Sequence, residues 1–227
     1  MTAPTDDITT GIARLRRSVA HLHTELVRYG LVVWTAGNVS ERVPGADLMV
    51  IKPSGLDYDE LTPERMVVCD LDGNVVEGDL SPSSDAAAHA YVYRHLPDVG
   101  GVVHTHSTYA VAWAARGEEV PCVLTAMADE FGGPIPVAPF ALIGTDAIGR
   151  MVVETLRDSH SPAVLVQNHG PFTVGRDGRA AVKAAVMCED VCRSVHIARQ
   201  LGEPTPIAPD DVERLYARYQ GAYGQRG

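Results

Sequence analysis

The first thirty residues carry apolar side chains at the three- and four-residue intervals of an amphipathic helix. The apolar residues that share this helical face are Ile12, Leu15, Val19, Leu22 and Leu26. Gly30 follows at the point where a helix commonly ends in a left-handed residue. The pattern predicts an N-terminal helix with one buried face.

Shorter β-branched and apolar runs, separated by turn residues, predict strands further along the chain. Residues 66–78 contain the pair Asp72 and Gly73, which is typical of a hairpin turn. Residues 162–175 predict two strands around a turn at 169–171. The other predicted strands are 39–43, 48–52 and 102–106.

Helical segments alternate with these strands. Residues 81–97 predict a helix with Ser83 or Ser84 at its N-cap and Pro97 just beyond its end. The other predicted helices are 108–117, 145–158, 179–201 and, after a proline-rich connector, 210–220. Because the order lacks a regular β-α-β rhythm, we expect an α/β fold of three layers with a mainly antiparallel central sheet flanked by helices. No change in composition divides the chain, so we expect one domain over residues 1–227.

The composition is that of a globular protein, with 45% hydrophobic and 21% charged residues. A net charge of −10 repels phosphate backbones, so no nucleic-acid partner is expected. No apolar run is long enough to span a membrane and the first residues are acidic, so we expect a cytoplasmic protein without a membrane partner. The glycine-rich signatures of dinucleotide and nucleoside triphosphate sites are missing, so no nucleotide cofactor is expected.

The histidines provide the strongest chemical signal. His104 and His106 are one residue apart after a β-branched run, and an extended backbone directs both imidazoles to the same side. His169 lies at a predicted turn, and a fourth ligand is either Asp85 or His89. Three neutral imidazoles and a carboxylate suit Zn²⁺ or a similar divalent cation, with a position left for substrate oxygens.

Five ordered motifs resemble those of the class II aldolase and adducin-head family. They are GNVSER, IKPSGLDYDEL, SPSSD, GGVVHTHS and NHGPF. The likeness runs from about Trp34 to Gly175 and resumes in the C-terminal tail. Within the family, the motifs are most similar to those of the L-ribulose-5-phosphate 4-epimerases.

The resemblance implies a role for each matching residue. Asp85 occupies the position of the epimerases' metal-binding aspartate, which fuculose-phosphate aldolases replace with glutamate, and this favours Asp85 over His89. Asp129 and Tyr223 match the proton-transferring pair of the epimerases, with the tyrosine supplied by a neighbouring subunit. The implied metal ligands are Asp85, His104, His106 and His169. The residues implied to hold the sugar phosphate are Gly37, Asn38, Ser54, Gly55, Ser83 and Ser84, with Lys52 adding positive charge.

The resemblance also implies an activity and an assembly. The expected reaction interconverts L-ribulose 5-phosphate and D-xylulose 5-phosphate by breaking and remaking the C3–C4 bond. The alternative is an aldolase that cleaves a sugar phosphate such as L-fuculose 1-phosphate, because Met127 and Glu130 flank Asp129 where the epimerases carry histidine and tyrosine. The third hypothesis is a non-catalytic, adducin-like interaction domain. Family members form rings of four, so we expect a homotetramer in which the tail, residues 203–227, contributes to a neighbouring subunit's site.

Overall fold

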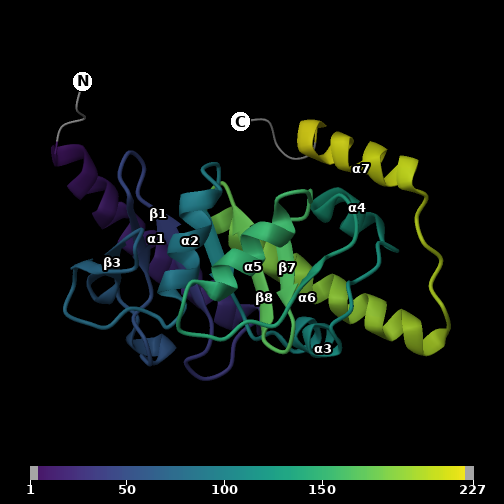
Figure 1. Ribbon diagram of the computed structural model, residues 1–227, viewed down its shortest axis with the longest axis horizontal. Helices are drawn as coiled ribbons and strands as arrows, with labels where there is room; N and C mark the ends of the chain where they lie inside the picture. Colours follow the sequence, from purple (N-terminus) through teal and green to yellow (C-terminus); the bar gives the residue numbers. More distant parts are fainter. Residues whose placement is uncertain (1–4, 223–227) are drawn as a thin grey trace.

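A single mixed sheet organises the chain in the computed structural model, which describes residues 5–222 (Figure 1). Within these residues the sheet has eight strands in the order β4-β3-β2-β1-β5-β8-β7-β6. Every neighbouring pair is antiparallel except β6 and β7, which are parallel. The strands are β1 (Asn38–Arg42), β2 (Leu48–Ile51), β3 (Val67–Asp70), β4 (Val75–Glu77), β5 (Gly101–His104), β6 (Val137–Ala138), β7 (Ala163–Val166) and β8 (Gly170–Gly175).

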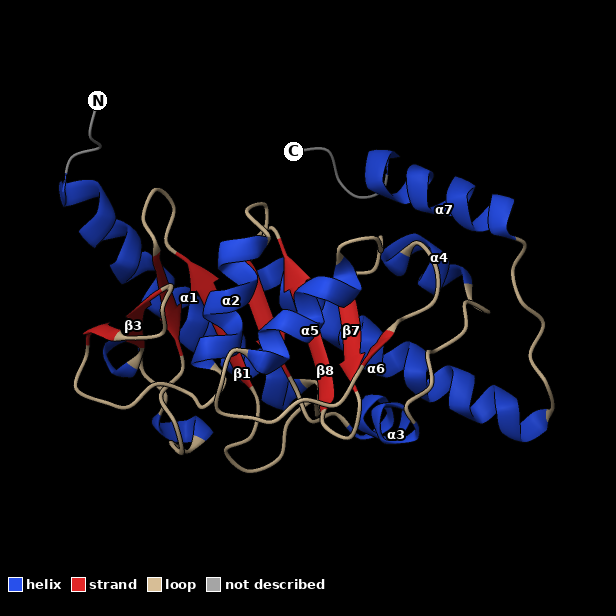
Figure 2. Cartoon of the chain, in the orientation of Figure 1, coloured by secondary structure: helices blue, strands red, loops and turns tan. Residues whose placement is uncertain are grey.

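Helices cover both faces of this sheet (Figure 2). Side chains that alternate along a strand enter different clusters, as a period of two requires. Val102 of β5 packs in the cluster that contains residues of α2 and α5, whereas Val103 packs with α1 and α6. The helices are α1 (Thr5–Arg28), α2 (Ala86–His95), α3 (Thr108–Arg116), α4 (Thr125–Phe131), α5 (Ala147–Leu156), α6 (Gly178–Leu201) and α7 (Pro209–Ala222). The predicted three-layer α/β fold with a mainly antiparallel sheet is therefore confirmed.

None of the helices between residues 5 and 222 combines the length and apolar character that a membrane crossing requires. The predicted N-terminal helix is present as α1, and Gly30 beyond it is left-handed, with φ of 66°. The hairpin at Asp72 and Gly73 is also present as the turn between β3 and β4.

Two local predictions were wrong. The N-cap of α2 is Asp85, not Ser83 or Ser84, because the helix begins at Ala86. The Ser83 hydroxyl accepts hydrogen bonds from Asp85 N and Asn38 Nδ2, ahead of the helix. The turn between β7 and β8 lies at residues 167–169, so Gly170 and its neighbour Pro171 belong to β8. Asp129 lies on the short helix α4. No capping side chain marks the start of this short helix, which is stabilised by burying its apolar face.

The N-terminus of α6 approaches β5 closely at Gly101. A Cβ added to Gly101 would lie less than 3.0 Å from backbone atoms of Asp177 and Gly178. The amide N–H of Gly178 donates to the buried Glu41 carboxylate of β1 at 2.8 Å, which fixes the helix against the sheet. Only glycine at position 101 leaves room for this contact.

A buried histidine makes the stability of the fold depend on pH. The His23 Nδ1–H donates to Val19 O at 2.7 Å, and Nε2 accepts from Val39 N–H at 3.0 Å, so the native contacts require the neutral ring. Burial lowers the pKa of His23 to about 3 and that of His89 to about 4. The unfolded chain therefore binds more protons than the native chain below pH 6.5 or so, and stability is lost as the pH falls from there toward 4.

We expect the free energy of unfolding, measured in urea, to change little between about pH 7 and pH 8 and to fall by up to about 1.4 kcal/mol per pH unit for each such histidine below pH 6.5 or so. A His23→Gln variant is expected to show a shallower slope, since the glutamine does not titrate. His95→Gln removes an exposed histidine and provides the control. An identical slope in His23→Gln and wild type would contradict the assignment.

Candidate metal and sugar-phosphate site

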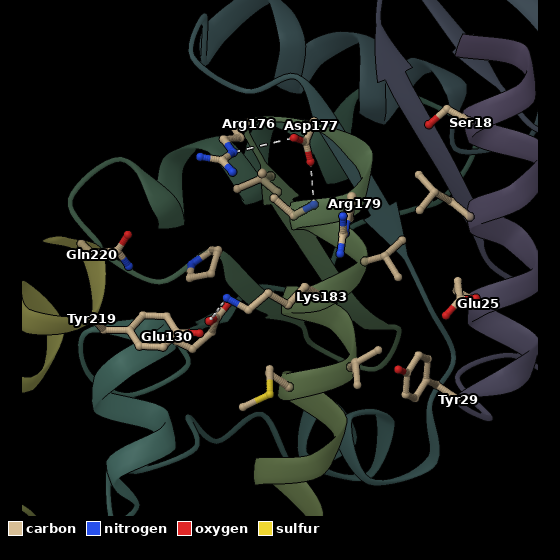
Figure 3. Close-up of a pocket in the computed structure, with 18 of the residues that line it drawn as sticks. Ser18, Glu25, Tyr29, Glu130, Arg176, Asp177, Arg179, Lys183, Tyr219 and Gln220 are labelled. Carbon is tan, nitrogen blue, oxygen red and sulfur yellow. Dashed lines mark hydrogen bonds and ion pairs between the residues drawn. The ribbon is translucent and has the colours of Figure 1, made fainter. Parts of the chain in front are cut away.

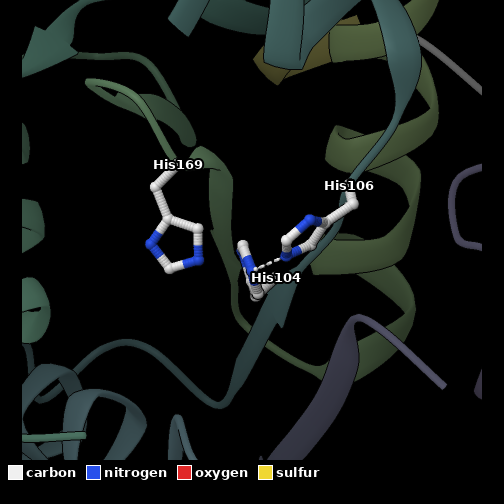
Figure 4. Close-up of side chains that lie close together, drawn as sticks. All are labelled: His104, His106 and His169. Carbon is white, nitrogen blue, oxygen red and sulfur yellow. Dashed lines mark hydrogen bonds between the residues drawn. The ribbon is translucent and has the colours of Figure 1, made fainter. Parts of the chain in front are cut away.

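Three histidines converge at one end of the central strands (Figure 4). His104 is the last residue of β5, His106 follows two positions later, and His169 lies in the turn before β8. One ring nitrogen from each lies within 4.8 Å of the others, and the Nε2 atoms of His104 and His106 are 2.9 Å apart. Pairing of β5 with β8 sets His104 opposite Phe172, which brings the turn that carries His169 alongside.

The position of His104 is set by two contacts. Its Nδ1–H donates to Pro171 O at 3.0 Å, which leaves the lone pair of Nε2 directed to the other histidines. Its ring also stacks on Phe172, with centroids 4.3 Å apart. Metal-binding histidines usually donate their second N–H in this way, because the hydrogen bond fixes the ring and its tautomer.

The electrostatics favour neutral rings. Burial lowers the pKa of His104 to about 3, and it also lowers the pKa values of His106 and His169. Neutral imidazoles keep their lone pairs available, and two lone pairs 2.9 Å apart repel unless a proton or a cation lies between them. The donor set therefore fits a divalent cation.

Asp85 lies beside this cluster at the start of α2. Asn38 Nδ2 donates to Asp85 Oδ2 at 2.7 Å and to Ser83 Oγ at 3.0 Å. Burial acts to raise the pKa of Asp85, but the neighbouring His104 and the hydrogen bond from Asn38 keep that pKa below its ordinary value. The carboxylate is therefore ionised at neutral pH. The group of ligand atoms within 4.8 Å comprises the three histidines without Asp85.

His89, the other candidate for a fourth ligand, is fully buried one helical turn after Asp85. Its Nδ1 is 2.7 Å from Ser40 Oγ, and its Nε2 has no hydrogen-bond partner among residues 5–222. Nδ1 is therefore engaged by β1, and His89 is not one of the three clustered histidines.

The three segments predicted to hold a sugar phosphate lie side by side. Hydrogen bonds join Asn38 to Ser83 and Ser83 N to Lys52 O, the latter at 2.9 Å. Ser54 N donates to Ser81 O at 2.9 Å, which ties the second segment to the third. Ser84 follows directly in that third segment.

Glycine and lysine complete these segments. Gly37 has a φ of 82° and packs so closely on the His104 backbone that an added Cβ would be 3.0 Å from His104 O. Gly55 is also left-handed, with φ of 64°. Lys52 is buried, donates from Nζ to Thr35 O at 2.8 Å, and has a pKa that burial lowers. The three segments thus meet next to the histidines through Gly37.

Of the two predicted acid/base residues, the structure describes Asp129, which is not part of the histidine cluster. Asp129 lies on α4, and its carboxylate is 3.5 Å from Arg218 Nη2 of α7. None of its contacts within the described residues reaches the three histidines. Tyr223 lies outside the described residues. The chain by itself therefore does not bring Asp129 to the metal cluster.

A cavity of about 1260 Å³ opens between α1, α6 and α7 (Figure 3). Lys183 of α6 lies within it and pairs with Glu130 of α4 at 2.6 Å, beside the ring of Tyr219. The cavity is also lined by Arg176 and Asp177, which follow the last residue of β8. His169 precedes the first residue of β8, so the cavity and the histidines lie at opposite ends of this strand. None of the described candidate site residues lines this cavity.

One residue near the site has no signal in the sequence. Glu189 of α6 accepts hydrogen bonds from the backbone N–H groups of Tyr109 and Ala110, at 3.0 and 2.9 Å. These groups belong to the first turn of α3, which begins two residues after His106. Glu189 therefore caps α3 in place of Ser107, the N-cap residue, whose side chain makes no capping bond. The sequence around a glutamate within a long helix gives no indication of such a contact.

Comparison with known proteins agrees with this fold. Residues 17–196 match the family model described as Class II Aldolase and Adducin N-terminal domain, so the chain belongs to the class II aldolase and adducin family. An L-ribulose-5-phosphate 4-epimerase UlaF from Salmonella paratyphi B is 41% identical, with 94% of this chain and 99% of the relative covered. An UlaF epimerase from Salmonella typhi is equally similar, with 41% identity and the same coverage.

Solved structures add aldolases to the comparison. The structure of an L-fuculose 1-phosphate aldolase matches with a TM-score of 0.86 and 27% identity, covering 96% of this chain and 98% of the aldolase. The L-fuculose-1-phosphate aldolase from Thermus thermophilus matches with a TM-score of 0.68 and 28% identity, covering 85% of this chain and 99% of its own. The family predicted from the five motifs is thus confirmed.

Proposed function

We propose that the chain is a metal-dependent epimerase that interconverts L-ribulose 5-phosphate and D-xylulose 5-phosphate. The carrying observation is the convergence of three neutral imidazoles beside Asp85, in a chain 41% identical over nearly its full length to an L-ribulose-5-phosphate 4-epimerase. His104, His106, His169 and Asp85 are the proposed ligands, and Zn²⁺ is the proposed ion, because it favours histidine nitrogen with one carboxylate oxygen. When bound, the ion supplies positive charge that stabilises negative charge on the substrate oxygens.

The carbon to be inverted, C4, poses a chemical problem. It is not adjacent to the ketone, so its C–H proton is too weakly acidic for simple removal. Opening the C3–C4 bond avoids this: a base takes the C4 hydroxyl proton, C4 becomes an aldehyde, and the bonding electrons pass to the dihydroxyacetone fragment. After the aldehyde rotates, C3 attacks its other face and an acid returns a proton to the C4 oxygen. The atoms balance without an external oxidant.

The chain's own residues supply binding and proton transfer in this proposal. Asn38, Ser83 and the adjacent Ser84 offer N–H and hydroxyl donors for the phosphate, and Gly37 and Gly55 allow close approach. Lys52 and Ser54 belong to the same phosphate-binding set. Asp129 and Tyr223 serve as the acid/base groups, one on each face of the aldehyde.

A homotetramer is part of the proposal. Asp129 pairs with Arg218 of α7 rather than with groups near the histidines of its own chain, which is consistent with its serving the site of a neighbouring subunit. The tail, residues 203–227, would likewise carry Tyr223 to a neighbour's site. In this proposal the tail and the rest of the chain form one domain. Light scattering at micromolar concentration is expected to give four times the chain mass, and a monomeric mass would contradict the assembly. We also place the enzyme in the cytoplasm, where its free cysteines would stay reduced.

Removal of either proton-transferring group is expected to lower kcat by about 10² to 10⁴ while leaving the bound metal unchanged. The variants are Asp129→Asn and Tyr223→Phe. The control is Tyr29→Phe, which alters a half-exposed tyrosine just beyond the end of α1. Turnover is measured with a coupled assay for D-xylulose 5-phosphate, and metal by elemental analysis. Wild-type turnover in both acid/base variants would exclude these roles.

The decisive experiment incubates metal-loaded protein with L-ribulose 5-phosphate and measures D-xylulose 5-phosphate. A product that appears with wild type and disappears with a variant lacking His104 supports the proposal. Full metal occupancy without any xylulose 5-phosphate would reject the epimerase while retaining the metal site.

The second candidate is an aldolase, favoured by the TM-score of 0.86 to an L-fuculose 1-phosphate aldolase. Such an enzyme breaks the same kind of bond and releases both fragments. Incubation with L-fuculose 1-phosphate and assay for free dihydroxyacetone phosphate and lactaldehyde distinguishes the two, since an epimerase retains its fragments. Release at a rate above that of epimerisation would establish the aldolase.

A further inference from the structure

Strand β1 and helix α2 are joined by a row of polar contacts that begins at the candidate metal site. Asn38 donates to Asp85, as described above, and the next inward-facing residue of the strand, Ser40, contacts the next turns of the helix. Ser40 Oγ is 2.7 Å from His89 Nδ1 and 2.8 Å from Tyr93 Oη. One serine hydroxyl therefore links two successive turns of α2 to the strand.

A third step extends this row. Arg42 of β1 donates from Nη1 to the carbonyl oxygen of Tyr93 at 3.0 Å. The strand positions are two residues apart, which is about 6.8 Å, and the helix positions are four apart, which is about 6.0 Å. Because these repeats nearly match, the contacts hold helix and strand in one relative register. We call the residues Asn38, Ser40, Arg42, Asp85, His89 and Tyr93 the β1–α2 seam.

The middle of the seam is costly to bury. Ser40, His89 and Tyr93 each have 0% exposure. Within the part of the chain that the structure describes, His89 Nε2 has no hydrogen-bond partner, and an unsatisfied buried polar group costs about 1 to 3 kcal/mol. Apolar residues would fill the same space at lower cost, so packing alone does not explain why three polar side chains meet here.

The seam leads directly to the metal ligands. Asn38 lies opposite His104 in the β1–β5 pair, and Asp85 is the N-cap of α2. A shift of α2 along β1 by even part of a helical turn would move Asp85 relative to His104. The three histidines would not move with α2, because they are carried by β5 and by the turn before β8. The seam is the row of polar contacts that resists this slip.

We propose that Ser40, His89 and Tyr93 are positioning residues that set the register of α2 and so hold Asp85 against the metal histidines. His89 acts here through Ser40, not as a metal ligand. This inference rests on the proposed metal site and adds residues to it. Substitution of residues that hold metal ligands in place, without binding the metal themselves, typically weakens metal affinity by 10- to 100-fold.

The test compares two buried serines. Ser40→Ala removes the hydroxyl at the centre of the seam, and Ser161→Ala removes a hydroxyl that is also buried and also makes two contacts, but only with Ala163. Zn²⁺ affinity of each protein is measured by competition with a coloured chelator, without substrate. We expect about tenfold weaker binding for Ser40→Ala and wild-type binding for Ser161→Ala. Equal affinities in the two variants would overturn the proposal.

Crystal structures of the metal-free wild type and Ser40→Ala separate this inference from the proposed metal site. The position of Asp85 relative to His104 can be read whether or not a cation binds, and we expect it to move in the variant. An unmoved Asp85 overturns the positioning role, whereas wild-type protein that binds no Zn²⁺ rejects the metal site. If Ser40→Ala does not fold, Tyr93→Phe removes only the tyrosine hydroxyl that contacts Ser40. This variant is expected to weaken Zn²⁺ binding by a smaller factor. Unchanged Zn²⁺ binding in Tyr93→Phe would count equally against the proposal.

Discussion

Replacing His104 with asparagine is expected to weaken metal binding by more than about a hundredfold and to reduce turnover to background. His104 is the most buried of the three histidines, and its ring is closer to each of the other two rings than they are to each other. Its Nε2 is 2.9 Å from that of His106. Asparagine is too short to present a donor atom at the same place. Elemental analysis of protein purified without chelator and the coupled assay measure the two effects.

The control for this prediction is His196→Asn, which changes an exposed histidine on α6 that contacts Gln200. We expect this variant to keep both metal and turnover. Since His104 also packs on Phe172, circular dichroism and urea unfolding should show that His104→Asn is folded. A folded His104→Asn protein that retains one metal ion per chain would contradict the proposed ligand set.

The substitution Gly101→Ala is expected to destabilise the fold by about 3 kcal/mol or more. The new methyl group would lie less than 3.0 Å from backbone atoms of Asp177 and Gly178, which cannot rotate away as a side chain can. Relief requires α6 to move off the sheet and weakens the hydrogen bond from Gly178 N to Glu41. Urea unfolding at pH 7.5 measures the loss.

Gly11→Ala provides the matched control. Gly11 lies inside α1, and an added Cβ would meet nothing within 4 Å. Because alanine is the better helix former, this variant is expected to be more stable than wild type by up to about 1 kcal/mol. If both substitutions changed stability by the same amount, close packing at Gly101 would not be the cause.

Elements with strong local signals were predictable from the sequence. The apolar face of α1, its stop at Gly30 and the hairpin at Gly73 follow from side-chain spacing and from backbone angles that favour glycine. Helix α4 and the two-residue strand β6 were missed, since both are short and depend on tertiary contacts rather than on local preference. The N-cap of α2 was misplaced because the serine hydroxyl of residue 83 bonds across to Asn38.

Only the residues of the candidate site that lie in sequence motifs could be predicted. His104, His106 and His169 were candidate ligands from the sequence itself, and the family resemblance favoured Asp85 over His89 as the fourth. By contrast, the contacts that orient these groups come from distant segments with no local signature. Ser40 is one alternating strand residue among several, and Glu189 lies in the middle of a 24-residue helix. Their roles depend on which elements pack together, which periodicity does not reveal.

The three clustered histidines come from two chain segments that are far apart in the sequence but adjacent as β5 and β8. An ion bound to all three would bridge those segments in the native state and have no equivalent partner in the unfolded chain. Thermal melting should therefore report on free Zn²⁺, with each tenfold increase above the dissociation constant adding about 1.4 kcal/mol to native stability. Chelator titration followed by calorimetry would thus measure occupancy without any substrate, and a melting temperature independent of Zn²⁺ would show that the segments are not bridged.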